Sequence, residues 1–420
     1  MLGLAIAYLR NRALTTALNI LLLGFAVATL IILLLFSSQL GARLDRDAQG
    51  IDLVVGAKGS PLQLILSSIY QIDAPTGNIP LESIALLRSD PAVKSAIPLA
   101  LGDNFRGFRI VGTEAAYIDL YSAKLTQGRV FGKEQEVVIG STVARELGMK
   151  LDQRFVGTHG LDASSEAGEH DNAPFTNVGI LAPTGSVIDR LILTPVESVW
   201  DAHGIVHENE HSEEAVHDEH AHEDEQENAK TLTERGEMKP EITALLVSYR
   251  SAFGAVRIPS MVNRQTEMQA AVPAIEMARL LNLLGVGIDG ARLFAWLLAL
   301  TGGLSIFVAL LNAAQAREGD LALLRVMGAT RGNVVGTIIS EGLITGAAGS
   351  VLGLLIGHGA MAIAVSSFTQ LQDLSIDPLQ FHPGEFIIVA AVLAIGLLAA
   401  AIPAIRVFRT DIAVTIARAN

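Results

Sequence analysis

An uncharged apolar run of 23 residues, from Leu14 to Phe36, constrains this chain more than any other feature. As an α-helix the run would measure about 34 Å, which is enough to cross a hydrocarbon core of about 30 Å. Arg10 and Arg12 precede it, as basic residues precede the apolar part of a signal peptide. A cleaved signal has an apolar region of only about 7–15 residues, so we expect an uncleaved membrane anchor.

Three more apolar runs follow, at residues 293–316, 334–365 and 386–405. More than 250 residues separate the first run from the second, whereas the last three lie close together. Only 17% of the residues are charged, against about 25% in an ordinary soluble domain. The sequence therefore predicts an α-helical membrane protein with four transmembrane helices, one plus three, and a large domain inserted between the first two.

Basic residues in the short loops indicate the orientation of these spans. They flank the first run, separate the second from the third and follow the fourth: Arg10, Arg12, Arg317, Arg325, Arg331, Arg406, Arg409 and Arg418. With four spans they all lie on one side, so both termini are predicted to be cytoplasmic. The chain would be a multi-pass protein of a bacterial inner membrane, with residues from about 40 to about 285 in the periplasm.

The inserted segment has the pattern of a mixed α/β domain. Strand-like runs occur at residues 51–55, 108–111, 136–139, 177–181, 191–194 and 243–249. Ser141 to Leu147 is predicted to be a helix that Gly148 ends, and residues 263–284 have a helical pattern that runs into the second span. We therefore divide the chain into a first span (1–40), a periplasmic α/β domain (41–285) and a three-span domain (286–420).

Residues 201–229 form an acidic insert in the α/β domain. They hold eleven Asp or Glu and no Lys or Arg, which accounts for most of the chain's net charge of −13. The nearly neutral remainder shows no basic patch that would favour nucleic acid. Six histidines lie among the carboxylates: His203, His207, His211, His217, His220 and His222. Because imidazole binds zinc, copper and nickel, we expect a weak metal-binding tract, zinc first; the alternative is a solvated linker.

A further interpretation of the insert is proteolysis, because His207-Glu-Asn-Glu-His211 fits the His-Glu-x-x-His pattern of zinc proteases. A tract this rich in His and Glu produces the pattern by composition, so we disfavour that interpretation and predict no catalytic residue. The chain has no cysteine, which excludes disulfides, thiolate metal sites and cysteine nucleophiles.

The short loop at residues 317–333, between the second and third spans, has the pattern of a docking element. On a helix Leu321, Leu324 and Met327 share one face and arginines lie beside that face, and Gly328 would end the helix. Such a helix suits contact with a cytoplasmic partner; the alternative is a solvated loop. The residues predicted to make this contact are Arg317, Asp320, Leu321, Leu324, Arg325, Gly328, Ala329 and Arg331.

Glycines recur at intervals of four residues in the third span, in two rows: Gly342 and Gly346, then Gly349, Gly353 and Gly357. Small residues at this spacing let helices approach closely, either within one chain or across a dimer. Two ionisable residues share this span, Glu341 near its start and His358 near its far end. We expect a structural role for both.

The docking loop resembles the Arg-x-x-Glu-Ile-x-Leu-Leu-Arg-x-x-Gly-Ala signature of MacB/FtsX-like ABC transporter permeases. The matching residues are Arg317, Leu323, Leu324, Arg325, Gly328 and Ala329, with Asp320 and Leu321 as near equivalents. Pro403, Ala404 and Asp411 are similar to the family's closing element, although Ile412 stands where a proline is usual. Residues 128–131, 136–140 and 143–148 resemble stretches of the family's periplasmic domain.

The resemblance implies a permease subunit that forms a homodimer or heterodimer and binds two copies of a separate cytoplasmic ATPase. ATP-driven movement would then do work outside the membrane, with a periplasmic protein or lipoprotein as a further partner. The chain itself is expected to be non-catalytic, because Gly56-Ala-Lys-Gly-Ser60 does not have the spacing of a phosphate-binding loop.

Three interpretations of the biological role stay open. The first is handling of zinc or another divalent metal, which rests on the histidine-rich insert. The second is release of lipoproteins or export of a peptide or lipid. The third is a non-transport scaffold that activates a periplasmic enzyme.

Overall fold

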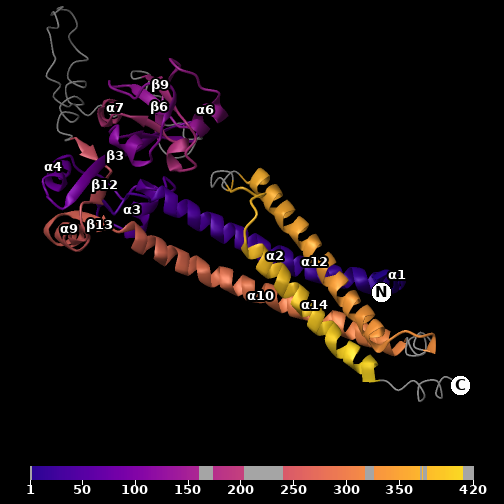
Figure 1. The fold of residues 1–420 in the computed structure, drawn as a ribbon. Helices are drawn as coiled ribbons and strands as arrows, with labels where there is room; N and C mark the ends of the chain where they lie inside the picture. Colours follow the sequence, from indigo (N-terminus) through magenta and orange to yellow (C-terminus); the bar gives the residue numbers. More distant parts are fainter. Residues whose placement is uncertain are drawn as a thin grey trace, which may run out of the picture. The chain divides into compact units, whose positions relative to one another are not determined.

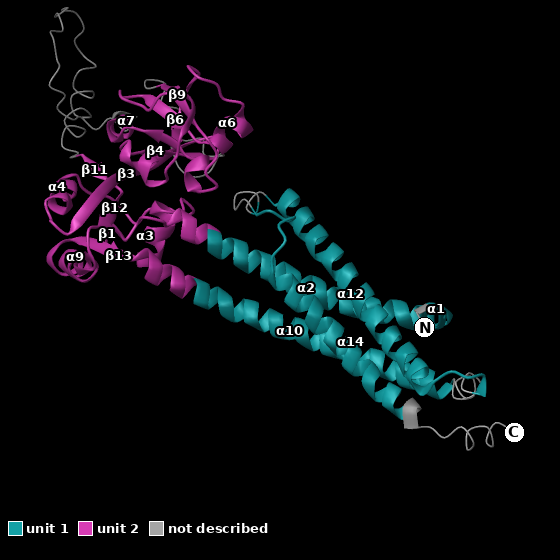
Figure 2. Cartoon of the chain, in the orientation of Figure 1, with its two compact units in different colours: residues 1–42, 281–420 teal, residues 43–280 magenta. Residues whose placement is uncertain are grey.

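The computed structural model describes residues 2–159, 174–202, 240–316, 326–368, 371 and 376–409. The chain separates into two compact units, residues 1–42 with 281–420 and residues 43–280 (Figures 1 and 2). Both boundaries fall inside long helices, α2 (Ala13–Asp47) and α10 (Pro273–Ala316). The division of the sequence at 40/41 and 285/286 stays a prediction.

The first unit consists of long apolar helices. Four helices are long and apolar enough to cross a membrane: α2, α10, α12 (Arg331–Ser367) and α14 (Gly384–Arg409). A short helix, α1 (Leu2–Asn11), precedes α2 and packs on α12. The α/β unit lies in the sequence between α2 and α10, so the predicted fold class, one span plus three, is confirmed.

Shape rather than the hydrophobic effect holds the membrane helices together, because lipid tails are as apolar as leucine. Leu23, Val27 and Ile31 of α2 are fully buried against the other helices. An extensive helix pair joins α12 to α14. Side chains on the outer faces of the same helices are exposed, as expected for surfaces that meet lipid.

The second unit is built on a mixed sheet, and its strand order in the described residues is β13-β1-β12-β3-β4-β10-β6-β9-β5. The bounds along this path are β13 (Met268–Ala271), β1 (Leu53–Ala57), β12 (Ala244–Tyr249), β3 (Val93–Phe105), β4 (Phe108–Gly112), β10 (Ile192–Thr194), β6 (Glu136–Ile139), β9 (Phe175–Leu181) and β5 (Leu125–Gly128). Short strands β7 (Arg154–Phe155) and β8 (Thr158–His159) add to β9 and β3, and β2 (Ile79–Pro80) pairs with β11 (Glu241–Ile242).

The long strand β3 joins two hydrophobic clusters. Its first half pairs with β12 and its second half with β4, with an irregularity between Leu101 and Asn104. One cluster lies around β1 and β12, beneath α4 (Glu82–Arg88) and α9 (Ala252–Gln265). The other lies around β4, β6 and β9, beside α6 (Ser141–Leu147). The remaining helices are α3 (Pro61–Ser68), α5 (Ala116–Leu120), the 3-10 helix η1 (Val187–Arg190) and α7 (Val196–Ala202).

The local predictions for this unit are confirmed at each strand-like run, which form β1, β4, β6, β9, β10 and β12. Gly148 ends α6 in the left-handed conformation, with φ of 63°. The prediction of one helix from residue 263 was wrong. Residues 268–271 form β13 although Met, Gln and Ala favour a helix, because the free edge of β1 offers backbone partners that override local preference; α10 begins only at Pro273.

An ion pair closes the loop between β5 and β6. Arg129 donates from Nη1 and Nη2 to the two carboxylate oxygens of Glu136, at 2.7 and 2.6 Å. The backbone N–H of Gly132 donates to the same carboxylate at 2.9 Å. These donors, Arg129 first, lower the pKa of Glu136 to about 2. The carboxylate therefore favours the folded state while it is ionised.

This ion pair predicts an acid-dependent contribution to stability. A glutamate in an unfolded chain has a pKa of about 4.3. The ion pair's contribution to the free energy of unfolding is therefore complete above that pH and is lost as the pH falls toward about 2. We expect Glu136→Gln to lower the free energy of unfolding at neutral pH and to lose this effect in acid. Denaturant unfolding of the detergent-solubilised protein across pH would measure the difference. Glu146→Gln, an exposed carboxylate of α6, is the control, and an equal pH response in both variants would contradict the assignment.

Candidate functional site

The predicted docking residues belong to the segment between α10 and α12. Arg317, Asp320, Leu321, Leu324 and Arg325 lie outside the described residues. The described flank begins at Val326, and both Val326 and Met327 are exposed, at 63% and 74%. Apolar side chains therefore face outward at the end of a segment whose sequence is rich in arginine, which suits contact with another protein.

The start of α12 is set by a turn and a cap. Gly328 has φ of +101°, a conformation that favours glycine, and Ala329 follows it. Thr330 is the N-cap, and its hydroxyl accepts a hydrogen bond from the N–H of Asn333 at 3.2 Å. Arg331 is the first helical residue. The predicted docking residues 328, 329 and 331 thus define where the chain turns from the segment into the membrane helix.

The glycines of α12 lie against two helices of the same chain. Gly342 and Gly346 face α14, where the backbone carbonyl of Gly396 lies 2.8 Å from a Cβ built on Gly342. Gly349, Gly353 and Gly357 face α2, where Leu23, Val27 and Ile31 lie 2.7, 2.4 and 3.1 Å from Cβ atoms built on them. Glycine at these positions allows α12 to pack closely between α2 and α14.

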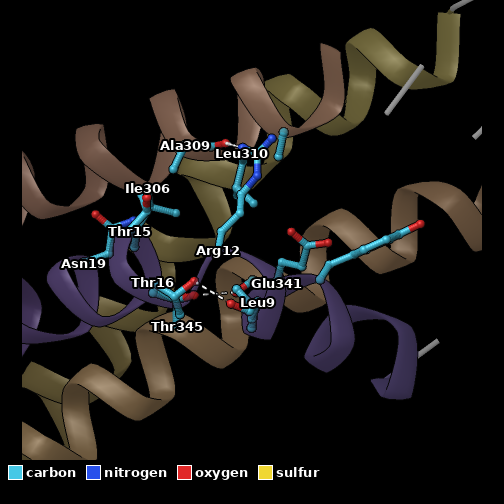
Figure 3. Close-up of a pocket in the computed structure, with 12 residues that line it drawn as sticks. Leu9, Arg12, Thr15, Thr16, Asn19, Ile306, Ala309, Leu310, Glu341 and Thr345 are labelled. Atoms are coloured by element: carbon cyan, nitrogen blue, oxygen red, sulfur yellow. Dashed lines mark hydrogen bonds between the residues drawn. The ribbon is translucent and has the colours of Figure 1, made fainter. Parts of the chain in front are cut away.

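A small cavity with a few polar groups in its lining lies between α1, α2, α10 and α12, in the first half of α12 (Figure 3). Arg12 and Glu341 both line it, and Glu341 is only 4% exposed. Arg12 donates to the carbonyl of Ala309 at 3.5 Å, and Asn19 accepts from the hydroxyl of Ser305 at 2.6 Å. Polar contacts between helices are worth about 1 kcal/mol each in a membrane.

The size of this cavity restricts what it can hold. Its volume is about 30 Å³, which is enough for about two water molecules. It is too small for a peptide, a lipid or a hydrated solute. The polar groups around it, such as Arg12 and Asn19, therefore serve to connect the helices that line it.

The end of α2 is fixed inside the α/β unit. The hydroxyl of Tyr70 donates to the carbonyl of Leu44 at 3.1 Å, and that of Tyr121 donates to the carbonyl of Asp47 at 2.9 Å. The carboxylate of Asp47 accepts from the N–H of Val187 at 2.7 Å. The Tyr121 hydroxyl satisfies a carbonyl that the last turn of a helix leaves without a partner, at about 1 kcal/mol. The Tyr70 hydroxyl is a second donor to the carbonyl of Leu44, which also accepts from the N–H of Ala48. Burial raises the pKa of both tyrosines, so their hydroxyls stay protonated donors.

The helices α2 and α10 connect to neighbouring strands of the sheet. β1 begins shortly after α2 ends, and α10 begins one residue after β13. These two strands pair antiparallel, with Val54 opposite Ala271. Thus α2 and α10, which lie far apart in sequence, are connected to adjacent strands at one edge of the sheet.

Sequence reasoning missed the contacts that fix the end of α2. Tyr70 and Tyr121 are far apart in sequence and belong to no local pattern, so only their shared position in the fold reveals the role. The predicted metal ligands, His203, His207, His211, His217, His220 and His222, lie outside the described residues. Within the described parts of the chain no group of three or more His, Asp or Glu side chains is placed to hold a metal ion.

Two protein-family models match this chain. The model of the FtsX-like permease C-terminal domain matches residues 292–412, and that of the MacB-like periplasmic core domain matches residues 16–222. Together they cover most of the sequence, with the periplasmic core domain before the permease domain. The class defined by this fold is a membrane permease subunit with an inserted α/β domain. The chain belongs to the MacB/FtsX-like ABC transporter permeases, so the resemblance seen in the sequence is confirmed.

Two solved structures are similar to part of the chain. The periplasmic region of MacB from Actinobacillus actinomycetemcomitans is 12% identical, with a TM-score of 0.33, and the match covers 56% of this chain and 96% of that one. The extracellular domain of the noncanonic ABC-type transporter YknZ from Gram-positive bacteria is 14% identical, with a TM-score of 0.29, and covers 52% and 98%. A comparison with curated proteins found no match. The family assignment rests on the two family models.

The contact of α12 with α2 predicts the effect of a single added methyl group. A Cβ on Gly353 would lie 2.4 Å from the Cβ of Val27 and 2.8 Å from the carbonyl oxygen of Gly24. We expect Gly353→Ala to destabilise the membrane unit by about 1–3 kcal/mol, as overpacking does. Gly359→Ala, in the same helix with nothing within 4 Å, is the matched control. Unfolding in mixed detergent micelles measures both, and equal stability of the two variants would refute the close contact.

Proposed function

We propose that this chain couples ATP hydrolysis by a separate cytoplasmic ATPase to conformational work by its α/β domain. One observation carries the proposal: α10 is a continuous helix that begins one residue after β13 and ends at the docking segment. Its 44 residues correspond to about 66 Å of helix. A displacement of the docking segment can therefore act on β13 through a single helix, α10.

The end of α2 supports the same function. Tyr70, Tyr121 and Val187 form hydrogen bonds with the last turn of α2. Because these bonds fix the helix end to the α/β domain, a movement of α2 would move the domain with it. The second helix entering the domain, α10, follows the strand paired with β1. Two helices joined to adjacent strands give the domain two points at which it can be moved.

Permeases of this family work with a cytoplasmic ABC ATPase. For this chain we assign the contact to Arg317, Asp320, Leu321, Leu324, Arg325, Gly328, Ala329 and Arg331. The exposed side chains of Val326 and Met327 extend the apolar part of that surface. The chain lacks a phosphate-binding loop in its sequence, so we assign ATP hydrolysis to the partner and a non-catalytic role to this subunit.

The orientation follows from the arginines beside the spans. We place both termini and the docking segment in the cytoplasm of a bacterium, the spans in its inner membrane and the α/β domain in the periplasm. The working unit is a dimer of this chain or of this chain with a similar permease. A periplasmic protein or lipoprotein receives the work, either for lipoprotein release or peptide or lipid export, or as an enzyme that a non-transport scaffold activates.

The docking assignment predicts the outcome of a pull-down. Tagged protein purified from its native membrane in mild detergent should bring down an ABC ATPase in roughly equal amount, and Arg325→Glu should abolish the interaction through charge reversal. Arg10→Glu makes the same change in charge outside the segment and should retain the ATPase. Mass spectrometry identifies the partners.

Other outcomes of that experiment separate the interpretations. A co-purified lipoprotein, peptide or lipid would indicate release or export, and a bound hydrolase would indicate a scaffold. If no ATPase is recovered while other membrane complexes stay intact, the proposed coupling fails.

The histidine-rich insert supports a second, narrower proposal, a role in handling zinc or another divalent metal. Its support is the sequence alone, six histidines among eleven carboxylates within residues 201–229. Deletion of residues 201–229 should change growth under zinc limitation or zinc excess. Growth and cellular zinc equal to those of the parent strain would remove the metal proposal and leave the ATPase coupling untouched.

A further inference from the structure

A polar cluster lies where α12 ends and α14 begins, at the opposite end of α12 from the docking segment. His358 of α12 contacts the carbonyl oxygen of Pro378 through Nδ1, at 2.7 Å, and Oε2 of Glu385 through Nε2, at 3.1 Å. Glu385 is fully buried, and the His358 side chain is 19% exposed. A buried carboxylate in direct contact with a histidine is costly unless a proton joins them.

The same cluster fixes the connection between the two helices. The other carboxylate oxygen of Glu385, Oε1, accepts from the backbone N–H of His382 at 2.8 Å. Gln39 of α2 donates to the carbonyl of Asp377 at 2.9 Å and accepts from its N–H at 2.8 Å. The described residues 376–383 are thus held by α2, α12 and α14 together.

The chemistry of these contacts determines how many protons the pair holds. The carbonyl of Pro378 can only accept, so Nδ1 of His358 carries a hydrogen. The contact between Nε2 and Oε2 needs a second proton, on either atom. With that proton the pair has no net charge; without it, a lone pair of Nε2 faces an ionised carboxylate and the hydrogen bond is lost.

We propose that His358 and Glu385 share a proton that holds the 376–383 connection on α12, and that loss of this proton to solvent releases the connection. Closing binds one proton and opening returns it, so rising pH favours the open state. The other titratable groups of the described residues in this cluster are His382 and Asp377, both in the connection. This latch goes beyond the proposed ATPase coupling, because it acts at the far end of the membrane helices and needs no partner.

A spin label can report on the latch, because the chain has no cysteine of its own. Leu379 is 79% exposed and follows Pro378, so Leu379→Cys gives a single labelling position on the connection. The labelled full-length protein in detergent is examined by electron paramagnetic resonance from about pH 6 to about pH 9, which brackets histidine titration. Release of one proton predicts that the ratio of mobile to immobile label rises by up to about tenfold per pH unit.

Two variants in the Leu379→Cys background test the cause. In Glu385→Gln the amide can donate to neutral Nε2 and still accept from His382, so the label should stay immobile at every pH. His382→Asn removes a neighbouring titratable ring but keeps an acceptor for the N–H of Gly384, so the pH response should remain.

Three results would each overturn the latch: a label whose mobility does not change with pH in the otherwise unaltered chain, a pH response that persists in Glu385→Gln, or one that disappears in His382→Asn. A response that follows the predicted pattern in all three proteins would establish the shared proton as its cause.

Discussion

The close approach of α12 to α2 and α14 is the contact on which the membrane unit depends. Inside a bilayer, burial of apolar side chains brings helices together only weakly, because lipid offers the same apolar surroundings. Glycines remove the side chains that would keep the helices apart, and Gly353 and Gly342 illustrate the two faces of α12 that use this device. A few polar contacts, such as Asn19 with Ser305, add to this packing at about 1 kcal/mol each.

The α/β unit meets a different requirement, because it must receive two membrane helices without leaving their ends loose. Its sheet does so by pairing β1 with β13, the strands that follow α2 and precede α10. Tyr70 and Tyr121 complete the joint by donating to the last carbonyls of α2. Backbone pairing is suited to this task, since it resists sliding along the strand direction and does not depend on any one side chain.

The two ends of α12 carry different chemistry. At one end Gly328 and Thr330 turn the chain into α12 from the segment proposed to dock, whose described flank exposes the apolar side chains of Val326 and Met327. At the other end His358 and Glu385 hold the connection to α14 through contacts that contain an exchangeable proton. The helix between them packs tightly on its neighbours, so a permease built this way can respond at its two ends while the middle of the bundle stays intact.

The amino-acid sequence by itself determined the four spans, the inserted α/β domain, the strand-like runs and the family, because these features are written in local periodicity and short motifs. It also identified the glycines of α12, but not which helix each one would meet. Only the tertiary structure decided that residues 268–271 form a strand and that Tyr70, Tyr121 and Glu385 take up their partners. These contacts join residues far apart in sequence, and no local pattern encodes which distant groups a fold brings together.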